Sequence, residues 1–466
     1  MAEADVLLAQ THQMTFFGPS RAGEAQRRRP VGAALPRDMC RFERRPTSIE
    51  RPGLASTAVV ERRVQVSSHK QKAATCSGLV GLQNLGNTCF MNACIQCLAA
   101  CKPLTDFFIH TMSMQDLNVK NSMHGALALA FADLLRKLEK RPTFTSISPR
   151  ALRQQVGKWA PQFLGYLQHD SQEFLRFLLD GLGEDLNKIS LEPVPPVPPG
   201  ATDAAQAATA WLQHKSRNGS TMTELFGGLL LSVVTCLGCG ARSLTFDPYM
   251  DLSVPIPQRK GPVTLDDCFR SFTEVETLDG NERYSCSACS KLCPATKSLS
   301  VAKFPELLVV HLKRFSHTTW VCSLRHYPWH VLSRRHPLSP HMDRTLTTTL
   351  SQAKLATPVA FPCTPSGLDL SPFASPDIPH QPPPVYTLCG MCCHEEHGVG
   401  GHYIAVTKHG GEWYTFNDSV VDPGGLETAK TGTPYLLFYQ RDPKPQPQPR
   451  PARKEAVGHV LRPLPT

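Results

Sequence analysis

Two Cys-x-x-Cys pairs constrain the fold of this chain of 466 residues more than any other feature of its sequence. The pairs are Cys236/Cys239 and Cys286/Cys289, and 46 residues separate them. Each pair can chelate one side of a tetrahedral Zn²⁺ ion, and four thiolates close the coordination shell, so such a site is structural and not catalytic. The separation exceeds that of small zinc ribbons, so the pairs must lie on separate hairpins that the metal joins. Empty or partly degenerate ligation is the alternative, and nearby Cys293 is interpreted as a bystander.

The spacing of apolar residues changes along the chain. Helical spacing predicts helices over 123–138, 148–159 and 166–186, after a first helix that begins near residue 89. From residue 225 onward, short apolar runs are typical of strands. They lie at 229–235, 243–246, 283–284, 297–301, 306–312, 359–361, 386–388, 403–406, 413–417 and 435–439. The chain is therefore predicted to have an α+β fold, with a mostly helical first part.

The two ends of the chain differ from its body in composition. Residues 1–77 mix Arg clusters with Pro, Gly and Ser, and residues 442–466 are Pro-rich and basic. Both are predicted to lack a packed core, which leaves one folded body at 78–441. Residues 1–75 and 443–466 carry +6 and +4, which together equal the whole net charge of +10. Because the body is neutral, direct nucleic-acid binding is not expected of it.

Composition also bears on the compartment. No run of about 18 apolar residues predicts a membrane span, and the N-terminal residues do not resemble a secretory signal. The 17 cysteines are odd in number and include the Cys-x-x-Cys pairs, which fits reduced thiols and a metal better than disulfides. We therefore expect a cytoplasmic and/or nuclear protein that is monomeric and does not associate with membranes.

Cys89 has the local surroundings of a nucleophile. It follows the turn and cap residues Asn84, Gly86 and Thr88 and begins an apolar run that can be helical. At the first turn of a helix, free N–H groups and the helix dipole favour the thiolate. The same N–H groups and the Asn84 amide could hold an oxyanion formed when Cys89 attacks a carbonyl. For a cysteine without partners, a buried structural role is the more common interpretation.

A base and an orienting group follow much later in the chain. His402 lies where a glycine-rich loop, which includes Gly400 and Gly401, enters an apolar strand. Asn417 ends the next predicted strand, so a hairpin would bring its side-chain oxygen to the imidazole N–H. Asp418 could do the same or assist. Taken alone, His402 could equally be a surface or core histidine, and Asn417 and Asp418 could belong to an ordinary turn.

A third cluster lies at 168–175, where a helix is expected to start. Asp170 and Glu173 place carboxylates there, and the helix dipole stabilises them. Stabilisation of the helix start is enough to explain these two carboxylates. The functional alternative is that they bind a basic tail of the substrate.

In combination, these motifs resemble the ubiquitin-specific protease family of deubiquitinating enzymes. The resemblance covers roughly 78–441 and keeps the family's motif order. Its motifs are the Cys box at 81–97, the Gln-x-Asp-x-x-Glu-Phe stretch at 168–174, the two Cys-x-x-Cys knuckles, 308–315, 357–362, the Gly-His-Tyr box at 401–403, and 413–418.

The resemblance implies a papain-like cysteine protease with a helical thumb, a β-sheet palm and zinc-bearing β fingers at about 225–300. It implies hydrolysis of the bond after the C-terminal Gly of ubiquitin, with ubiquitin and ubiquitinated proteins as partners. In catalysis, Cys89 would be the nucleophile, His402 the base, Asn417 the orienting residue, Asn84 the oxyanion donor and Asp418 a support. The residues implied to bind ubiquitin are Gln168, Asp170, Glu173, Gly400, Gly401 and Tyr403.

Two stretches depart from the family pattern. Residues 316–353 are longer and less regular than expected, and are predicted to be a surface insert. If this insert occludes the site, the protein would be a catalytically impaired ubiquitin-binding scaffold. Residues 388–393 contain three cysteines and a glycine where an apolar strand is expected. A zinc-bearing nucleic-acid binder with basic tails is a third and weaker hypothesis.

Overall fold

The computed structural model describes residues 78–140, 145–188, 193–198, 200–316, 353–379, 382–397, 400–431 and 433–443. Contacts divide the chain into units 1–64 and 65–466, and every described residue lies in the second unit. The predictions for residues 1–77, for most of the insert and for nearly all of the C-terminal tail therefore lie outside the described residues. None of the helices in the described part is both long and apolar enough to cross a bilayer.

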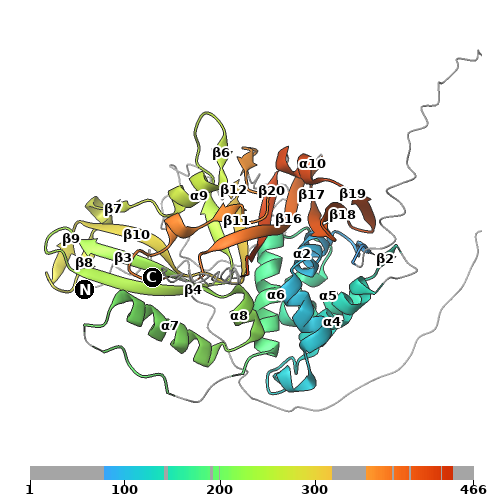
Figure 1. Ribbon diagram of the computed structural model, residues 1–466, viewed down its shortest axis with the longest axis horizontal. Coiled ribbons are helices and arrows are strands. Elements are labelled where there is room, and N and C mark those ends of the chain that lie inside the picture. The colour runs from blue at the N-terminus through green and yellow to red at the C-terminus, as the bar shows by residue number, and fades with distance from the viewer. Residues whose placement is uncertain are drawn as a thin grey trace, which may run out of the picture. The chain divides into compact units, whose positions relative to one another are not determined.

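Helices form the first layer, which we call the thumb (Figure 1). Their apolar residues face one core, and α2 is buried along almost its whole length between the other helices and the sheet. The helix expected from residue 166 begins five residues later, because Asp170 caps it. The helix expected from residue 123 begins after Gly125, whose φ of +76° is not helical. The thumb helices are α2 (Cys89–Ala99), α3 (Lys102–Asp106), α4 (Ala126–Glu139), α5 (Arg150–Trp159) and α6 (Ser171–Asp185).

An eight-stranded sheet, which we call the palm, packs against α2 and α6 (Figure 1). Its order is β19-β18-β17-β16-β20-β11-β5, with the short β15 (Leu368–Asp369) also paired to β16. All pairs are antiparallel except β11 with β5. The last strand of the chain, β20, therefore lies in the interior of the sheet. The strands are β5 (Leu252–Pro255), β11 (Leu307–Lys313), β16 (Val385–His397), β17 (Gly400–His409), β18 (Glu412–Asn417), β19 (Val420–Pro423) and β20 (Pro434–Arg441).

A four-stranded sheet of order β4-β3-β10-β7 forms the fingers. The hairpin β8–β9 carries the second cysteine pair beside the end of β3, and α7 packs on β3 and β4. Lys303 lies over the Trp211 ring of α7, with 4.1 Å between its Nζ and the ring centroid. These elements are α7 (Asp203–Arg217), α8 (Thr221–Phe226), β3 (Gly228–Cys236), β4 (Arg242–Tyr249), β7 (Glu276–Leu278), β8 (Tyr284–Cys286), β9 (Lys291–Cys293) and β10 (Ala295–Lys303).

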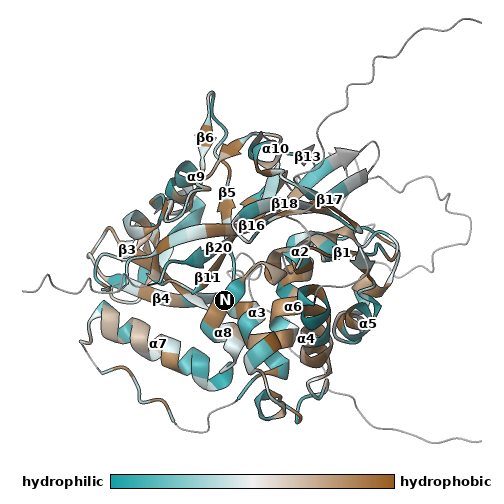
Figure 2. Ribbon diagram, turned by 45° about the vertical axis from the view of Figure 1, so that its right-hand side comes forward, coloured by the Kyte–Doolittle hydropathy of each residue, from teal (hydrophilic) through white to brown (hydrophobic). Residues whose placement is uncertain are grey.

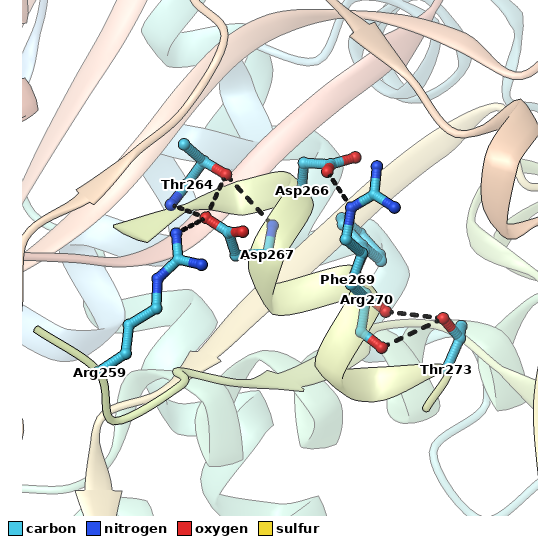
Figure 3. A network of polar contacts seen from close by, with 7 residues as sticks. All are labelled: Arg259, Thr264, Asp266, Asp267, Phe269, Arg270 and Thr273. Atoms are coloured by element: carbon cyan, nitrogen blue, oxygen red, sulfur yellow. Dashed lines mark hydrogen bonds and ion pairs between the residues drawn. The ribbon is translucent and has the colours of Figure 1, made fainter. Parts of the chain in front are cut away.

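Helix α9 (Leu265–Phe272) covers the other face of the palm and is fixed by a capping box (Figure 3). Asp267 accepts from Thr264 N–H at 2.8 Å, and Thr264 Oγ1 accepts from Asp267 N–H at 3.2 Å. Arg259 binds the same carboxylate at 2.6 Å. The cap thereby orients the buried Leu265 and Phe269 toward the sheet.

Two apolar cores lie on opposite faces of the palm. One joins the sheet to the thumb helices, and the other joins it to α9 and the short strands. Figure 2 shows the hydrophobic residues concentrated along the central strands. The palm is thus a rigid support whose thumb-facing side can position groups for chemistry.

The remaining short elements tie loops together. β1 (Gly81–Leu82) pairs with β2 (Ser146–Ile147), and β6 (Val263–Thr264) pairs with β14 (Val359–Ala360), both in parallel. β12 (Phe315–Ser316) pairs antiparallel with β13 (Ala353–Lys354), so the two ends of the predicted insert meet in one ladder. Helix α10 (Leu426–Thr431) precedes β20.

Candidate active site

Cys89 is the first residue of α2 and lies at its positive end. The preceding loop is held by the Asn84 side chain, whose Oδ1 accepts from the backbone N–H groups of Gly86 (2.9 Å) and Thr88 (3.1 Å). The sharp turn needs φ values of +99° at Gly86 and +52° at Asn87. Cys89 therefore occupies the helix start at which the sequence predicts the nucleophile.

His402 of β17 and Asn417 of β18 lie side by side, because these strands form the expected antiparallel pair. His402 Nε2 donates to Asn417 Oδ1 at 2.8 Å, which leaves Nδ1 as the basic nitrogen. Hydrogen bonding with the Cys89 side chain raises the pKa of His402 to about 9, with a smaller contribution from Asn417 and against the effect of burial. The three predicted residues therefore meet at the junction of thumb and palm.

Asp418 contacts the amide side chains of the thumb. Its Oδ2 accepts from Asn84 Nδ2 at 2.9 Å, and its Oδ1 accepts from Asn92 Nδ2 at 2.7 Å. Its backbone carbonyl also accepts from Leu82 N–H. Its charge still helps to raise the pKa of His402, although it is the smallest of the causes. Asn417 accepts a direct hydrogen bond from the imidazole.

The loop before α6 closes one side of the site. Gln168 bridges to Gly401 in both directions, because its Nε2 donates to the Gly401 carbonyl (3.1 Å) and its Oε1 accepts from the Gly401 N–H (3.4 Å). A Cβ at Gly401 would lie 1.9 Å from His394 Nε2, so only glycine fits there. Gly400 begins the same strand.

The remaining predicted ubiquitin contacts differ in exposure. Asp170 Oδ1 caps α6 by accepting from Gln172 and Glu173 N–H, and Oδ2 accepts from Tyr435 Oη at 2.5 Å. The structural explanation therefore applies to Asp170 in this structure. The Glu173 side chain is exposed, whereas Tyr403 is 6% exposed, and burial raises its pKa.

Several residues of the site were missed by the sequence analysis. Arg153 of α5 donates to the carbonyls of Leu85, Leu164 and Gly165, which ties the loop of Cys89 to the loop before α6. Nothing in its local sequence distinguishes it from a surface arginine. Asn92 had a usable signal, because it is a polar residue on the buried face of α2, three residues after Cys89.

The four predicted metal ligands come together at the tip of the fingers. Cys236, Cys239, Cys286 and Cys289 place their sulfur atoms within 4.8 Å of one another. The two closest pairs measured are 3.6 Å and 4.0 Å apart. A tetrahedron with Zn–S bonds of about 2.3 Å has edges of about 3.8 Å, so the set fits Zn²⁺. N–H groups of Cys239 and Gly238 lower the pKa of Cys236 to about 6, which favours the ligating thiolate.

The chain was compared with known proteins. The family model described as "Ubiquitin carboxyl-terminal hydrolase" matches residues 80–439. Human ubiquitin carboxyl-terminal hydrolase 2 is 38% identical over 78% of this chain and 56% of its own length, and the chicken protein of that name is 38% identical over 78% and 93%. Human ubiquitin carboxyl-terminal hydrolase 21 is 34% identical over 78% and 62%. The chain thus spans a little more than half the length of the human hydrolase 2.

Solved structures give a similar result. The SAGA deubiquitinating module Ubp8/Sgf11/Sus1/Sgf73 bound to monoubiquitin matches with a TM-score of 0.55 and 25% identity, over 79% of this chain and 70% of the matched chain. The same module bound to ubiquitin aldehyde matches with a TM-score of 0.56 and 24% identity. The expected α+β architecture with cysteine-bearing fingers is confirmed.

Proposed function

The chain belongs to the ubiquitin-specific proteases of the ubiquitin carboxyl-terminal hydrolase family, and from this premise we propose that it is an active deubiquitinase. It would cleave the isopeptide or peptide bond after the C-terminal Gly of ubiquitin. The observation that carries the proposal is the meeting of the Cys89, His402 and Asn417 side chains at one place.

The first half of the reaction forms a thioester. His402 Nδ1 takes the thiol proton, and the Cys89 sulfur attacks the carbonyl carbon of the terminal Gly. Asn417 keeps the imidazole in the tautomer that leaves Nδ1 basic, since Nε2–H is donated to its side chain. His402 then gives the proton to the departing lysine amine.

The second half of the reaction hydrolyses the thioester and regenerates the free enzyme. A water attacks the thioester carbonyl while His402 accepts a water proton, and the carboxylate of ubiquitin leaves as Cys89 regains its proton. In both halves of the reaction, a hydrogen-bond donor must stabilise the negative charge that forms on the carbonyl oxygen. Asn84 Nδ2 has two hydrogens, and only one is used by Asp418, so the second is available for the oxyanion.

The substrate side of the proposal rests on the surfaces beside the site. Tyr166 and Leu167, 77% and 74% exposed, precede α6 next to the loop of Cys89. Exposed large apolar side chains at a catalytic junction fit a macromolecular partner. Solved modules of the same fold hold monoubiquitin, which supports ubiquitin as the partner. Gln168 and Glu173 would contact it from one side, and Gly400 and Gly401 from the other.

Zinc is proposed as the structural cofactor. The four finger cysteines would hold it, and it would supply a cross-link between the end of β3 and the hairpin β8–β9.

The proposal is tested with a ubiquitin probe that carries a C-terminal electrophile, and with a fluorogenic ubiquitin C-terminal substrate. We expect a covalent adduct at Cys89 in the full chain. Cys89→Ala should abolish both the adduct and cleavage while ubiquitin affinity stays near that of the wild type. The matched control is Cys363→Ala. This half-buried thiol donates a hydrogen bond to the Phe361 carbonyl and lies outside the catalytic cluster. Cleavage that survives in Cys89→Ala would refute the assignment, and an intact probe with no adduct would favour the impaired scaffold.

A further inference from the structure

The cysteine-rich stretch at 388–393 packs against the helix that carries the nucleophile. Cys94 and Cys97 lie on α2, and Cys101 follows its end, at the i, i+3, i+7 spacing of one helix face. Cys389 and Cys392 of β16 face the same core. A Cβ built at Gly390 lies 3.7 Å from the Cα of Cys97, an ordinary van der Waals distance, so the strand runs directly against the helix. We call these five thiols the seam; it joins thumb to palm.

One thiol pair of the seam lies in position to react. The Sγ atoms of Cys101 and Cys389 are 3.7 Å apart. Cys389 is the extra residue of a β-bulge, because Leu388 pairs with Tyr439 while Gly390 pairs with Phe438. A bulge redirects its extra side chain, which here points toward Cys101.

The members of this pair differ in access to solvent. Cys101 is 1% exposed, whereas Cys389 is half-buried and lines a surface pocket of about 340 Å³. Lys408, Arg441 and Asp442 line the same pocket, so its lining has one more basic than acidic side chain. Reactive cysteines typically lie in partly exposed, electropositive surroundings. The seam's Cys94 and Cys392 are both fully buried, which makes them an internal comparison.

We propose that Cys101 and Cys389 are a modification site at which hydrogen peroxide forms a reversible disulfide between thumb and palm. The Cys389 sulfur attacks a peroxide oxygen, which gives a sulfenic acid and one water. The Cys101 sulfur then attacks the Cys389 sulfur, the S–O bond breaks, and a second water leaves. Two thiols are oxidised, one H₂O₂ is reduced, and both thiol protons end in water.

The position of the Cys101–Cys389 disulfide in the fold determines its expected effect on stability. It joins residues 288 positions apart, so it restricts the unfolded chain strongly. It forms beyond the C-terminal end of α2, whereas Cys89 is at the N-terminal end. The cross-linked protein should therefore resist heat better than the reduced protein, with the catalytic junction left in place.

The test treats the full-length, zinc-loaded protein with increasing hydrogen peroxide, blocks free thiols and maps linked peptides by mass spectrometry. We expect a Cys101–Cys389 linked peptide and a rise in Tm, both reversed by dithiothreitol. Cys389→Ala and Cys101→Ala should lose both signals. The matched control Cys392→Ala, on the same strand and facing the same core, should keep both.

Three results would overturn the proposal. The first is oxidation of Cys389 to a sulfinic acid without a link to Cys101. The second is linkage of Cys94 to Cys392 at the same peroxide concentration. The third is an equal rise in Tm in Cys389→Ala. If Cys101→Ala fails to fold, Cys389→Ala decides alone, because its side chain is only half-buried.

Discussion

The φ angle of Asp418 gives the neighbouring side chains of Asn417 and Asp418 different contacts. Asn417 ends β18 in an extended conformation and faces His402, whereas Asp418 has a φ of +49°, in the left-handed region that Asp and Asn tolerate. The carboxylate therefore turns away from the imidazole and toward Asn84 and Asn92. We infer that Asp418 positions the oxyanion donor.

This inference predicts a specific kinetic defect. Asp418→Ala should lower kcat by about 10-fold to 100-fold, less than the roughly 100-fold to 1000-fold expected when a donor such as Asn84 is removed. KM should change little, because the lost interaction acts on the transition state. Steady-state cleavage of the fluorogenic ubiquitin substrate measures both constants. Asp422→Ala, an exposed acid on the adjacent strand, is the control, and wild-type kcat in Asp418→Ala would contradict the inference.

The pKa of His402 offers a second prediction. Because the Cys89 side chain is the largest cause of the rise to about 9, Cys89→Ala should move the titration midpoint of His402 down toward 6.5. A raised pKa stabilises the fold fully below 6.5, and this stabilisation is lost as the pH rises through about 9. The imidazole resonances, followed by NMR from pH 5 to 10, report the midpoint. Equal midpoints in both proteins would show that the thiol is not the cause.

At the scale of elements, the tip of the fingers brings together two cysteine pairs that lie on two separate hairpins. The β8–β9 hairpin has three residues in each strand, too few for independent stability. The sulfur cluster connects it to the longer β3.

Loss of one ligand should therefore release the metal and loosen the fingers. Cys239→Ala should lose bound zinc and unfold at a lower temperature than the wild type, because metal binding contributes directly to the folding free energy. Elemental analysis and calorimetry measure the two effects. Cys293→Ala is the matched control, since Cys293 is buried in the same cluster but is not among the four ligands, and it should keep its zinc. Zinc retained at wild-type level in Cys239→Ala would contradict the four-ligand assignment.

The sequence pattern predicted the presence of helices and strands better than it predicted where they end or which strands pair. Each predicted strand after residue 225 has an observed counterpart, because apolar runs that fill a buried sheet are locally visible. The short β5 and its parallel pairing with β11 were not foreseen, since pairing is a long-range property. The proximity of Cys89, His402 and Asn417 and the gathering of the four cysteines could be predicted because each residue type carries its own chemistry. The contacts of Asp418 and Arg153 could not, because they depend on a left-handed φ and on loop carbonyls.

At the scale of the whole molecule, the predicted insert leaves and re-enters the fold at one place. Phe315 pairs with Lys354 and Ser316 with Ala353, so the ends are neighbours in an antiparallel ladder. A short hairpin turn can join such strands.

Replacing residues 317–352 by an Asn-Gly turn should therefore leave the fold intact. We expect a Tm and a kcat/KM close to those of the full chain, within about twofold for the latter, since Cys89, His402 and Asn417 and the strands and helix that carry them all lie outside the replaced residues. Thermal unfolding and fluorogenic ubiquitin cleavage test this. A large gain in kcat/KM would instead support occlusion by the insert, and a loss of the cooperative transition would show that the fold needs it.

The interior place of β20 bears on how the chain is made. Residues Pro434–Arg441 fill the gap between β16 and β11, with six of the eight residues buried. A nascent polypeptide lacks this strand until residues 434–441 have emerged from the ribosome. Until then, two strands have no neighbour along their facing edges, and such edges attract other chains. The palm therefore cannot close before residues 434–441 are present, and a premature stop codon before residue 434 would yield an aggregation-prone product, whatever the state of its catalytic residues.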